Sequence, residues 1–241
     1  TDRLQHRVDL DRILAEVWPK APPASGVKTI RYHVSKLRDA LGDEGRSLIT
    51  TVRGGYVLEV EPDRIDATRF EEAVAQSRAI LAERPDRASR LLREALSMWR
   101  GEAMSDVAEY PFAAAEAARL DNLRLDALEG RIDADLACGR YAEVVGELEK
   151  LTSIHPMRER MFGQLMLAQY RLGRQADALH TCQRLRRTLA QELGVDPGHD
   201  IELLEERILV HDPGLVVGSP PAENMRAGIR APILTSVVVL A

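Results

Sequence analysis

The fold of the first part of this chain is decided by one segment, Thr29-Ile30-Arg31-Tyr32-His33-Val34-Ser35-Lys36-Leu37-Arg38-Asp39-Ala40-Leu41. Apolar residues recur there at steps of three and four, at Val27, Ile30, Val34, Leu37 and Leu41. This spacing predicts a helix that begins after Ser25 and ends at Gly42, with one buried face. The opposite face carries Lys28, Arg31, Tyr32, Ser35 and Lys36. The segment therefore predicts an amphipathic helix with a polar, mainly basic outer face.

The sequence on either side of this helix completes a helix-turn-helix and a hairpin. Upstream, Asp9 precedes an apolar stripe that Pro19 closes: Leu10, Ile13, Leu14, Val17 and Trp18. Downstream, two β-branched runs, 48–52 and 56–60, flank Arg53-Gly54-Gly55. Glycine accepts the positive φ of a tight turn, so this arrangement indicates a β-hairpin.

Charge is distributed unevenly along the 241 residues, whose net charge is −5. Residues 1–60 hold ten Lys and Arg against eight Asp and Glu, and residues 61–241 hold 23 against 30. A basic coat over the whole surface is therefore excluded, but a local basic patch is not. Aromatic residues make up only 4% of the chain. This low content disfavours proteins that stack single-stranded bases on exposed rings, and it leaves groove recognition of a duplex open.

An internal repeat organises the helical remainder of the chain. Gly139-Arg140-Tyr141-Ala142-Glu143 recurs as Gly173-Arg174-Gln175-Ala176-Asp177, an offset of 34 residues. This offset is the tetratricopeptide period, in which each helix pair buries its face on the next pair. Ala142 and Ala176 are expected to let paired helices approach closely. Helices between Thr68 and Gly101 are expected to form an earlier, atypical unit, which makes the fold mainly α.

Within the helical part, residues at helical spacing are interpreted as core rather than as a ligand pocket. These are Trp99, Tyr141, Met157, Phe162, Met161, Met166 and Tyr170. The run Arg184, Arg186 and Arg187 is expected to be a solvated face. A concave repeat surface is nevertheless a common site for peptides and partner proteins.

The sequence contains no recognisable signature of an enzyme, a metal site or a membrane span. The sequence has no GxSxG, no phosphate-binding glycine loop, no HExxH and no calcium loop. Cys138 and Cys182 are the only cysteines, and they lack metal-ligand spacing. The apolar end 229–241 is too short to cross a bilayer. We therefore expect no enzymatic activity, no cofactor, no bound metal and no membrane partner, and a cytoplasmic protein.

Both parts of the sequence resemble modules of a known family. Residues 7–60 resemble the later part of an OmpR-type winged helix-turn-helix, with its recognition helix at 29–41 and its wing at Thr51-Val52-Arg53-Gly54-Gly55-Tyr56-Val57-Leu58. Residues 66–212 resemble the bacterial transcriptional activator domain. The markers of this domain are Asp66-Ala67-Thr68-Arg69-Phe70, Glu94-Ala95-Leu96-Ser97-Met98-Trp99-Arg100-Gly101, His155-Pro156-Met157-Arg158-Glu159-Arg160 and Glu192-Leu193-Gly194-Val195-Asp196-Pro197. Together the two modules resemble the Streptomyces antibiotic regulatory protein family.

The resemblance implies a partial winged-helix domain over 1–61, a tetratricopeptide-like activator domain over 66–212 and a flexible tail over 213–241. The family's winged helix normally begins with a small sheet and a first helix, and the chain opens just before the second helix. Loss of both elements would expose the apolar face of Leu10, Leu14 and Trp18. Longer relatives continue into an ATPase, but the tail carries no GxxxxGK[ST].

The function implied by the resemblance is sequence-specific transcriptional activation, in which the winged helix binds direct repeats in double-stranded promoter DNA. The helical domain would then support a homodimer on DNA and contact RNA polymerase, and the protein would associate with the nucleoid. Arg31, Tyr32, Ser35 and Lys36 are the candidates for base or phosphate contacts, flanked by Lys28, Thr29 and His33, and Arg53 is the wing candidate. For Arg38, an ion pair within the domain and a phosphate contact remain open. The alternative hypothesis is a helical-repeat interaction scaffold, or an inactive fragment, that does not bind DNA.

Overall fold

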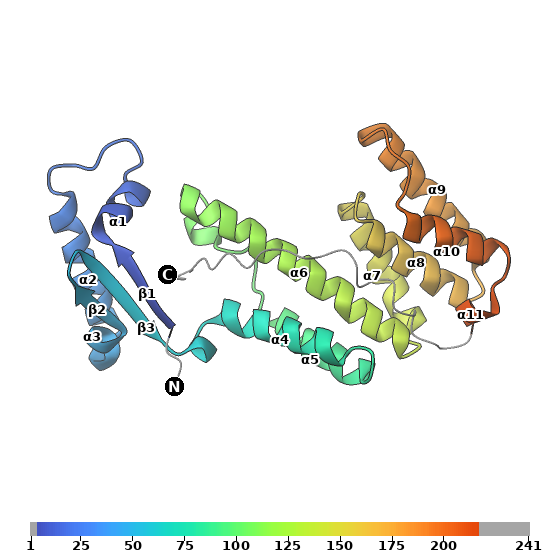
Figure 1. Cartoon of the computed structure of the whole chain (residues 1–241), viewed down its shortest axis with the longest axis horizontal. Helices are drawn as coiled ribbons and strands as arrows, with labels where there is room; N and C mark the ends of the chain where they lie inside the picture. Colours follow the sequence, from blue (N-terminus) through green and yellow to red (C-terminus); the bar gives the residue numbers. More distant parts are fainter. Residues whose placement is uncertain (1–3, 217–241) are drawn as a thin grey trace. The chain divides into compact units, whose positions relative to one another are not determined.

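The computed structural model of the protein describes residues 4–216 (Figure 1). The described residues form two compact units, one made of residues 4–72 and 97–124 and the other of residues 73–96 and 125–216. The domain boundary expected from the sequence lay between residues 61 and 66. In the structure, residues 66–72 and 97–124 group with the first unit instead. None of the helices within 4–216 has the length and apolar character that crossing a membrane requires.

A three-stranded antiparallel sheet opens the first unit. It consists of β1 (Leu4–Asp9), β2 (Ile49–Val52) and β3 (Gly55–Val60) in the order β1-β3-β2. The two later strands confirm the predicted hairpin. The strand β1 was not predicted, because its polar residues give no clear alternation and its partner β3 lies far along the chain, with Leu4 opposite Val60.

The helix-turn-helix is formed by α1 (Leu10–Val17) and α2 (Gly26–Ala40), followed by the short helices η1 (Gly42–Glu44) and α3 (Gly45–Leu48). Asp9 and Ser25 occupy the predicted N-cap positions, but neither makes a side-chain capping hydrogen bond. Gly26 is buried where α2 meets α1, and a Cβ at this position would lie 2.9 Å from Leu14 Cδ2. The turn between the helices is therefore tight because its glycine permits close contact.

The apolar stripe of α2 is covered along only part of its length. Ile30 is 6% exposed, whereas Leu37 and Leu41 are 51% and 47% exposed. The predicted burial of these two leucines is therefore wrong. Leu10, Leu14 and Trp18, whose exposure was expected, are half-buried, because Leu14 and Trp18 pack against Gly26 at the start of α2.

Replacing Gly55 with alanine is expected to destabilise this small sheet by about 1–3 kcal/mol, the cost of inserting an atom into a packed site. A Cβ at Gly55 would overlap the backbone carbonyl of Val8, so β1 and β3 would have to separate. Urea unfolding followed through Trp18 fluorescence, in a Trp99→Phe background, measures the effect. In the control Gly146→Ala, the helical position lies in the second unit and has no atom within 4 Å of the added Cβ, so the Trp18 transition should keep the midpoint of its parent. Equal unfolding midpoints for Gly55→Ala and its parent would contradict the prediction.

The remaining elements are all helical, which confirms the mainly α fold. They are η2 (Pro62–Arg64), α4 (Asp66–Ile80), α5 (Pro85–Ser97), η3 (Ser105–Val107), α6 (Pro111–Ala137), α7 (Tyr141–Ile154), α8 (Glu159–Arg171), α9 (Gln175–Glu192), α10 (His199–Leu209) and α11 (Pro213–Val216). The helix α11 includes the buried Leu215, so the flexible tail expected over 213–241 does not begin at residue 213. Residues 217–241 of that tail lie outside the described residues.

The predicted repeat has a structural counterpart at equivalent backbone positions. Gly139 and Gly173 adopt positive φ angles of 78° and 75° where α6 and α8 have ended. The next residues then donate backbone hydrogen bonds of 2.9 Å, from Arg140 N to the carbonyl of Asp135 and from Arg174 N to that of Gln169. Each glycine thus closes one helix in a left-handed conformation and starts the next.

The core of the second unit is built around α8, which packs on α7 on one side and on α9 and α10 on the other (Figure 1). Met161 and Leu165 belong to the cluster shared with α6 and α7, and Phe162 and Met166 to the cluster shared with α9 and α10. Met157, predicted as core, is 51% exposed. Ala142 and Ala176 are also exposed, and the closely packed small residues are instead Ala134, Ala168 and Ala178, each fully buried.

Candidate nucleic-acid interface

The candidate interface begins with the outer face of α2. Six of its predicted residues are exposed to solvent: Lys28, Arg31, Tyr32, His33, Ser35 and Lys36. Thr29 is half-buried, and its hydroxyl donates a 3.1 Å hydrogen bond to the carbonyl of Ser25. The Thr29 hydroxyl is therefore already engaged with the backbone of its own helix.

Helix periodicity places the exposed residues on one side of α2. Lys28, Tyr32 and Lys36 follow at intervals of four, so they lie one above the other along the helix. The ammonium of Lys36 lies 5.9 Å from the centre of the Tyr32 ring, and the His33 ring meets Tyr32 edge to face at 5.4 Å. Tyr32 is 59% exposed. The face therefore presents an aromatic ring between two basic side chains.

Arg38 has a role that neither sequence hypothesis anticipated. Its Nε donates to the carbonyl of Ile49 at 2.8 Å, and its Nη2 donates to Thr51 Oγ1 at 2.8 Å. Its guanidinium also lies 6.0 Å from the centre of the Tyr56 ring. Arg38 therefore ties α2 to the hairpin, and within residues 4–216 no carboxylate lies at ion-pair distance from it.

The wing is the turn between β2 and β3. Arg53 and Gly54 form this turn, and Gly54 has a φ of 84°. The Arg53 side chain is exposed, while its carbonyl accepts a 3.2 Å hydrogen bond from Nη2 of Arg7. Sequence reasoning missed Arg7, because a lone arginine in an unrecognised strand carries no local signal. The wing consequently has two cations, of which Arg7 also pairs with Asp9 at 2.9 Å.

The cations of this interface are available to an anionic partner. Across residues 4–216, no carboxylate lies within ion-pair distance of Lys28, Arg31, Lys36 or Arg53. The three α2 cations project from one helix, and Arg53 projects from the adjoining hairpin. An exposed helix with unpaired cations beside a basic turn can contact the phosphates of a duplex and offer donors to base edges.

Two buried acids of the second unit have shifted pKa values, and both are paired with arginines. Burial opposes ionisation of Asp135, but hydrogen bonds from Ser89 and Arg93 and nearby guanidinium charges outweigh it, so the pKa of Asp135 lies below its usual range. Burial raises the pKa of Glu129, although Arg158 and Arg160 pair with it. Such perturbation can mark an active site, but these contacts are those of a structural network. The described residues hold no group of three or more His, Cys, Asp or Glu able to bind a metal.

Comparison with known proteins agrees with both modules. Residues 2–58 match the family described as transcriptional regulatory protein, C terminal, and residues 65–209 match the bacterial transcriptional activator domain. The chain is 37% identical over 222 residues to the regulatory protein DnrI of Streptomyces peucetius, covering 88% of this chain and 82% of DnrI. It is also 40% identical over 196 residues to the regulatory protein AfsR of Streptomyces griseus, covering 81% of this chain and 20% of AfsR.

A solved structure shows the same arrangement of elements. EmbR of Mycobacterium tuberculosis, determined in complex with a low-affinity phosphopeptide, matches with a TM-score of 0.81 at 36% identity, over 86% of this chain and 55% of EmbR. The chain thus spans about half of EmbR and most of DnrI. EmbR is described as a transcriptional regulatory protein, as DnrI and AfsR are described as regulatory proteins. With a winged helix followed by an activator domain, the chain belongs to the Streptomyces antibiotic regulatory protein family of DNA-binding transcriptional activators.

Proposed function

We propose that this activator binds direct repeats in promoter DNA, with α2 in the major groove and the wing at the neighbouring minor groove. The observation that carries the proposal is the set of exposed cations without carboxylate partners on α2, together with Arg53 at the turn of the adjoining hairpin. A helix has the diameter that the major groove admits, and a short turn suits the narrower groove.

The residues of α2 divide into two proposed roles. Arg31, Ser35 and Lys36 offer donors to base edges or phosphates, while the exposed ring of Tyr32 supplies an apolar surface of the kind that contacts a thymine methyl group. Lys28 and His33 flank them and contact phosphates. Arg53, assisted by Arg7, contacts the backbone beside the wing. Thr29 contributes less directly, because its hydroxyl already donates to the carbonyl of Ser25.

The helical part is proposed to serve protein contacts, both in a homodimer on DNA and with RNA polymerase. Support comes from apolar side chains that remain exposed on it, including Ile154 and Val210, each 67% exposed, and Leu209, 56% exposed. Stacked helix pairs commonly present such surfaces to partner proteins. A regulator working in this way would be found in the cytoplasm on the nucleoid.

The test is selection of bound sequences from a random duplex library with the full chain. The proposal expects enrichment of one motif present twice in the same orientation, and analytical ultracentrifugation should give two chains per selected duplex. A single-site duplex should bind one chain with lower affinity, since the second protomer then lacks its site. Absence of any enriched motif would favour the alternative of a scaffold that does not bind DNA, and inverted rather than direct repeats would contradict the proposed arrangement.

A further inference from the structure

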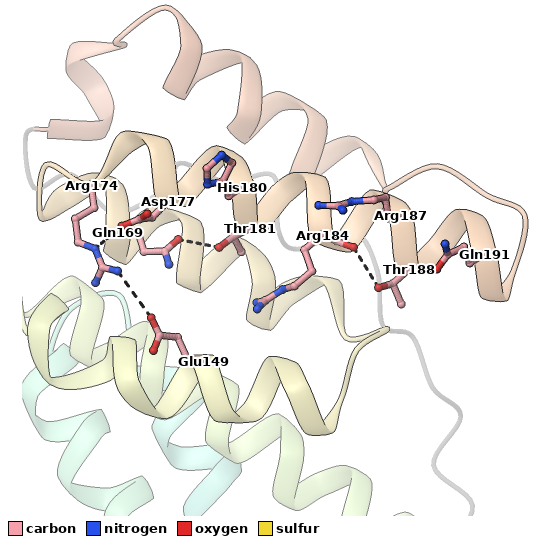
Figure 2. A pocket seen from close by; sticks show the side chains of 10 residues that line it. All are labelled: Glu149, Gln169, Arg174, Asp177, His180, Thr181, Arg184, Arg187, Thr188 and Gln191. Atoms are coloured by element: carbon pink, nitrogen blue, oxygen red, sulfur yellow. Dashed lines mark hydrogen bonds and ion pairs between the residues drawn. The ribbon is translucent and has the colours of Figure 1, made fainter.

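A polar groove runs along α9, far in sequence from the DNA-binding helix. The groove is open to solvent, has a volume of about 630 Å³ and is lined mainly by α9, with Glu149 from α7 and Gln169 from α8 (Figure 2). This volume lies within the ~300–1,000 Å³ usual for ligand sites in proteins. We propose that the groove binds an extended, acidic peptide segment of a partner protein. The proposal does not depend on DNA binding by α2.

The two ends of the groove differ in their charge balance. At one end Arg174 is neutralised, because its Nε lies 2.7 Å from Asp177 and its Nη2 lies 3.9 Å from Glu149. At the other end, Arg184 and Arg187 have no carboxylate within ion-pair distance among residues 4–216. Figure 2 shows both arginines on α9, toward the end that carries Thr188. This end is therefore an uncompensated cationic site.

Arg184 is held in position before any partner arrives. Its Nη2 donates to Thr152 Oγ1 at 3.0 Å, and its guanidinium lies 5.2 Å from the centre of the Phe162 ring. Thr152 and Phe162 are 2% and 1% exposed, so both contacts are with the rigid core. A guanidinium fixed in this way still has free N–H groups and binds a carboxylate with little loss of side-chain entropy.

Arg187 lies one turn further along α9 and is more loosely held. Its Nε donates to the carbonyl of Gln183 at 3.3 Å, and its side chain is exposed. Residues three apart on a helix lie on the same side, so Arg184 and Arg187 can receive two acidic side chains of one segment. Clusters of arginine are the usual means by which proteins recognise acidic motifs.

The charges at the opposite end select a peptide over a nucleic acid. Glu149 and Asp177 would repel a continuous line of phosphates, because a duplex carries charge at every step. A peptide can instead place acidic residues against Arg184 and Arg187 and neutral or basic residues near the two carboxylates. Concave surfaces of helical repeats commonly bind extended segments of this kind.

The experiment is a display selection of random dodecapeptides on the full chain. Enriched peptides are expected to contain paired Asp or Glu residues, and fluorescence anisotropy should give an affinity about tenfold weaker for Arg184→Gln/Arg187→Gln, since charge-assisted hydrogen bonds are lost. Arg187→Gln alone leaves the contacts of Arg184 to Thr152 and Phe162 intact and should show part of this loss of peptide affinity. This single variant replaces the double variant in the test if the double variant does not fold.

The control is Arg87→Gln, which removes one exposed positive charge of the same unit outside the groove and should leave peptide affinity unchanged. Lys36→Ala should also bind the peptide normally, which separates this site from the DNA-binding face. Failure to enrich acidic peptides, or equal affinity for wild type and the Arg184/Arg187 variants, would overturn the proposal. Loss of DNA affinity in those variants without any peptide binding would instead assign the groove to DNA.

Discussion

Replacing Asp135 with asparagine is expected to lower the free energy of unfolding of the second unit by about 3–5 kcal/mol, the usual cost of breaking a buried ion pair. The Asp135 side chain is 0% exposed. It accepts hydrogen bonds from Ser89 at 2.7 Å, Arg93 at 2.7 Å and Arg131 at 2.8 Å, and pairs with Arg140 at 2.9 Å. These partners come from α5, α6 and the start of α7, so one carboxylate joins three helices.

Asparagine keeps the shape of this side chain and removes its charge. The guanidinium of Arg131 is only 6% exposed, so it would lose one of its two counter-charges where water cannot replace it. Glu147, at 2.5 Å from Arg131, would remain as the other. An amide nitrogen would also face arginine donors that need an acceptor. The loss therefore exceeds that of a single neutral hydrogen bond.

Urea unfolding followed by far-UV circular dichroism measures the change. The matched control is Asp86→Asn, since Asp86 also pairs with Arg140, at 3.3 Å, but is 55% exposed. Solvent screens this surface contact, so Asp86→Asn should shift the unfolding midpoint far less than Asp135→Asn does. If the two variants lost equal stability, the Asp135 network would have no special role in joining the helices.

The free energy of unfolding should also depend on pH in the acid range through Asp135. Because its folded pKa is lowered, Asp135 contributes stability that is present above the unfolded value, about 3.9, and is lost as pH falls through the folded pKa. Glu129, with a raised pKa, acts in the opposite sense: its contribution is greatest below its unfolded pKa and is lost as pH rises through the folded one. Asp135→Asn should therefore unfold with a weaker dependence on pH below about pH 4 than the wild type.

The elements that could be predicted from sequence are those specified by neighbouring residues. The helix α2, its stop at Gly42 and the turn at Arg53-Gly54 follow from spacing and glycine conformation within a few positions. The repeat could be predicted for the same reason, since Gly139 and Gly173 each end a helix through their own conformation. The strand β1 could not be predicted, because it forms by pairing with β3 and its own residues show no strand pattern.

Residues whose roles depend on distant partners escaped prediction. Asp135 lies in a helix where a lone acid resembles an ordinary surface charge, yet Ser89 and Arg93 reach it from more than forty positions away. Arg38 gives no sequence signal of its bonds to β2. For the candidate DNA residues, the pattern could identify the outer face of α2, but it could not show that Thr29 is engaged with Ser25 or that Arg7 joins the wing.

The triple variant Arg31→Ala/Lys36→Ala/Arg53→Ala is expected to bind its selected duplex at least about a hundredfold more weakly than the wild type, since a good base contact contributes about 1–3 kcal/mol. All three side chains are exposed and lack carboxylate partners within residues 4–216, so their removal should leave the fold intact. Circular dichroism checks the fold, and anisotropy with labelled DNA gives the affinity. The control triple variant Arg69→Ala/Arg87→Ala/Arg100→Ala removes the same charge from exposed positions outside the winged helix.

Salt dependence separates the contributions of these cations to DNA binding. Each lost phosphate contact should reduce the slope of log affinity against log salt by about 0.9, because fewer counterions are released. Single variants at Lys36 or Arg53 that lower the slope therefore identify phosphate contacts, whereas Tyr32→Ala should leave the slope unchanged and relax the preference for one base. A triple variant that matched its control in DNA affinity and in slope would place DNA recognition outside α2 and the wing. Loss of three DNA-contacting cations must change at least one of these two quantities.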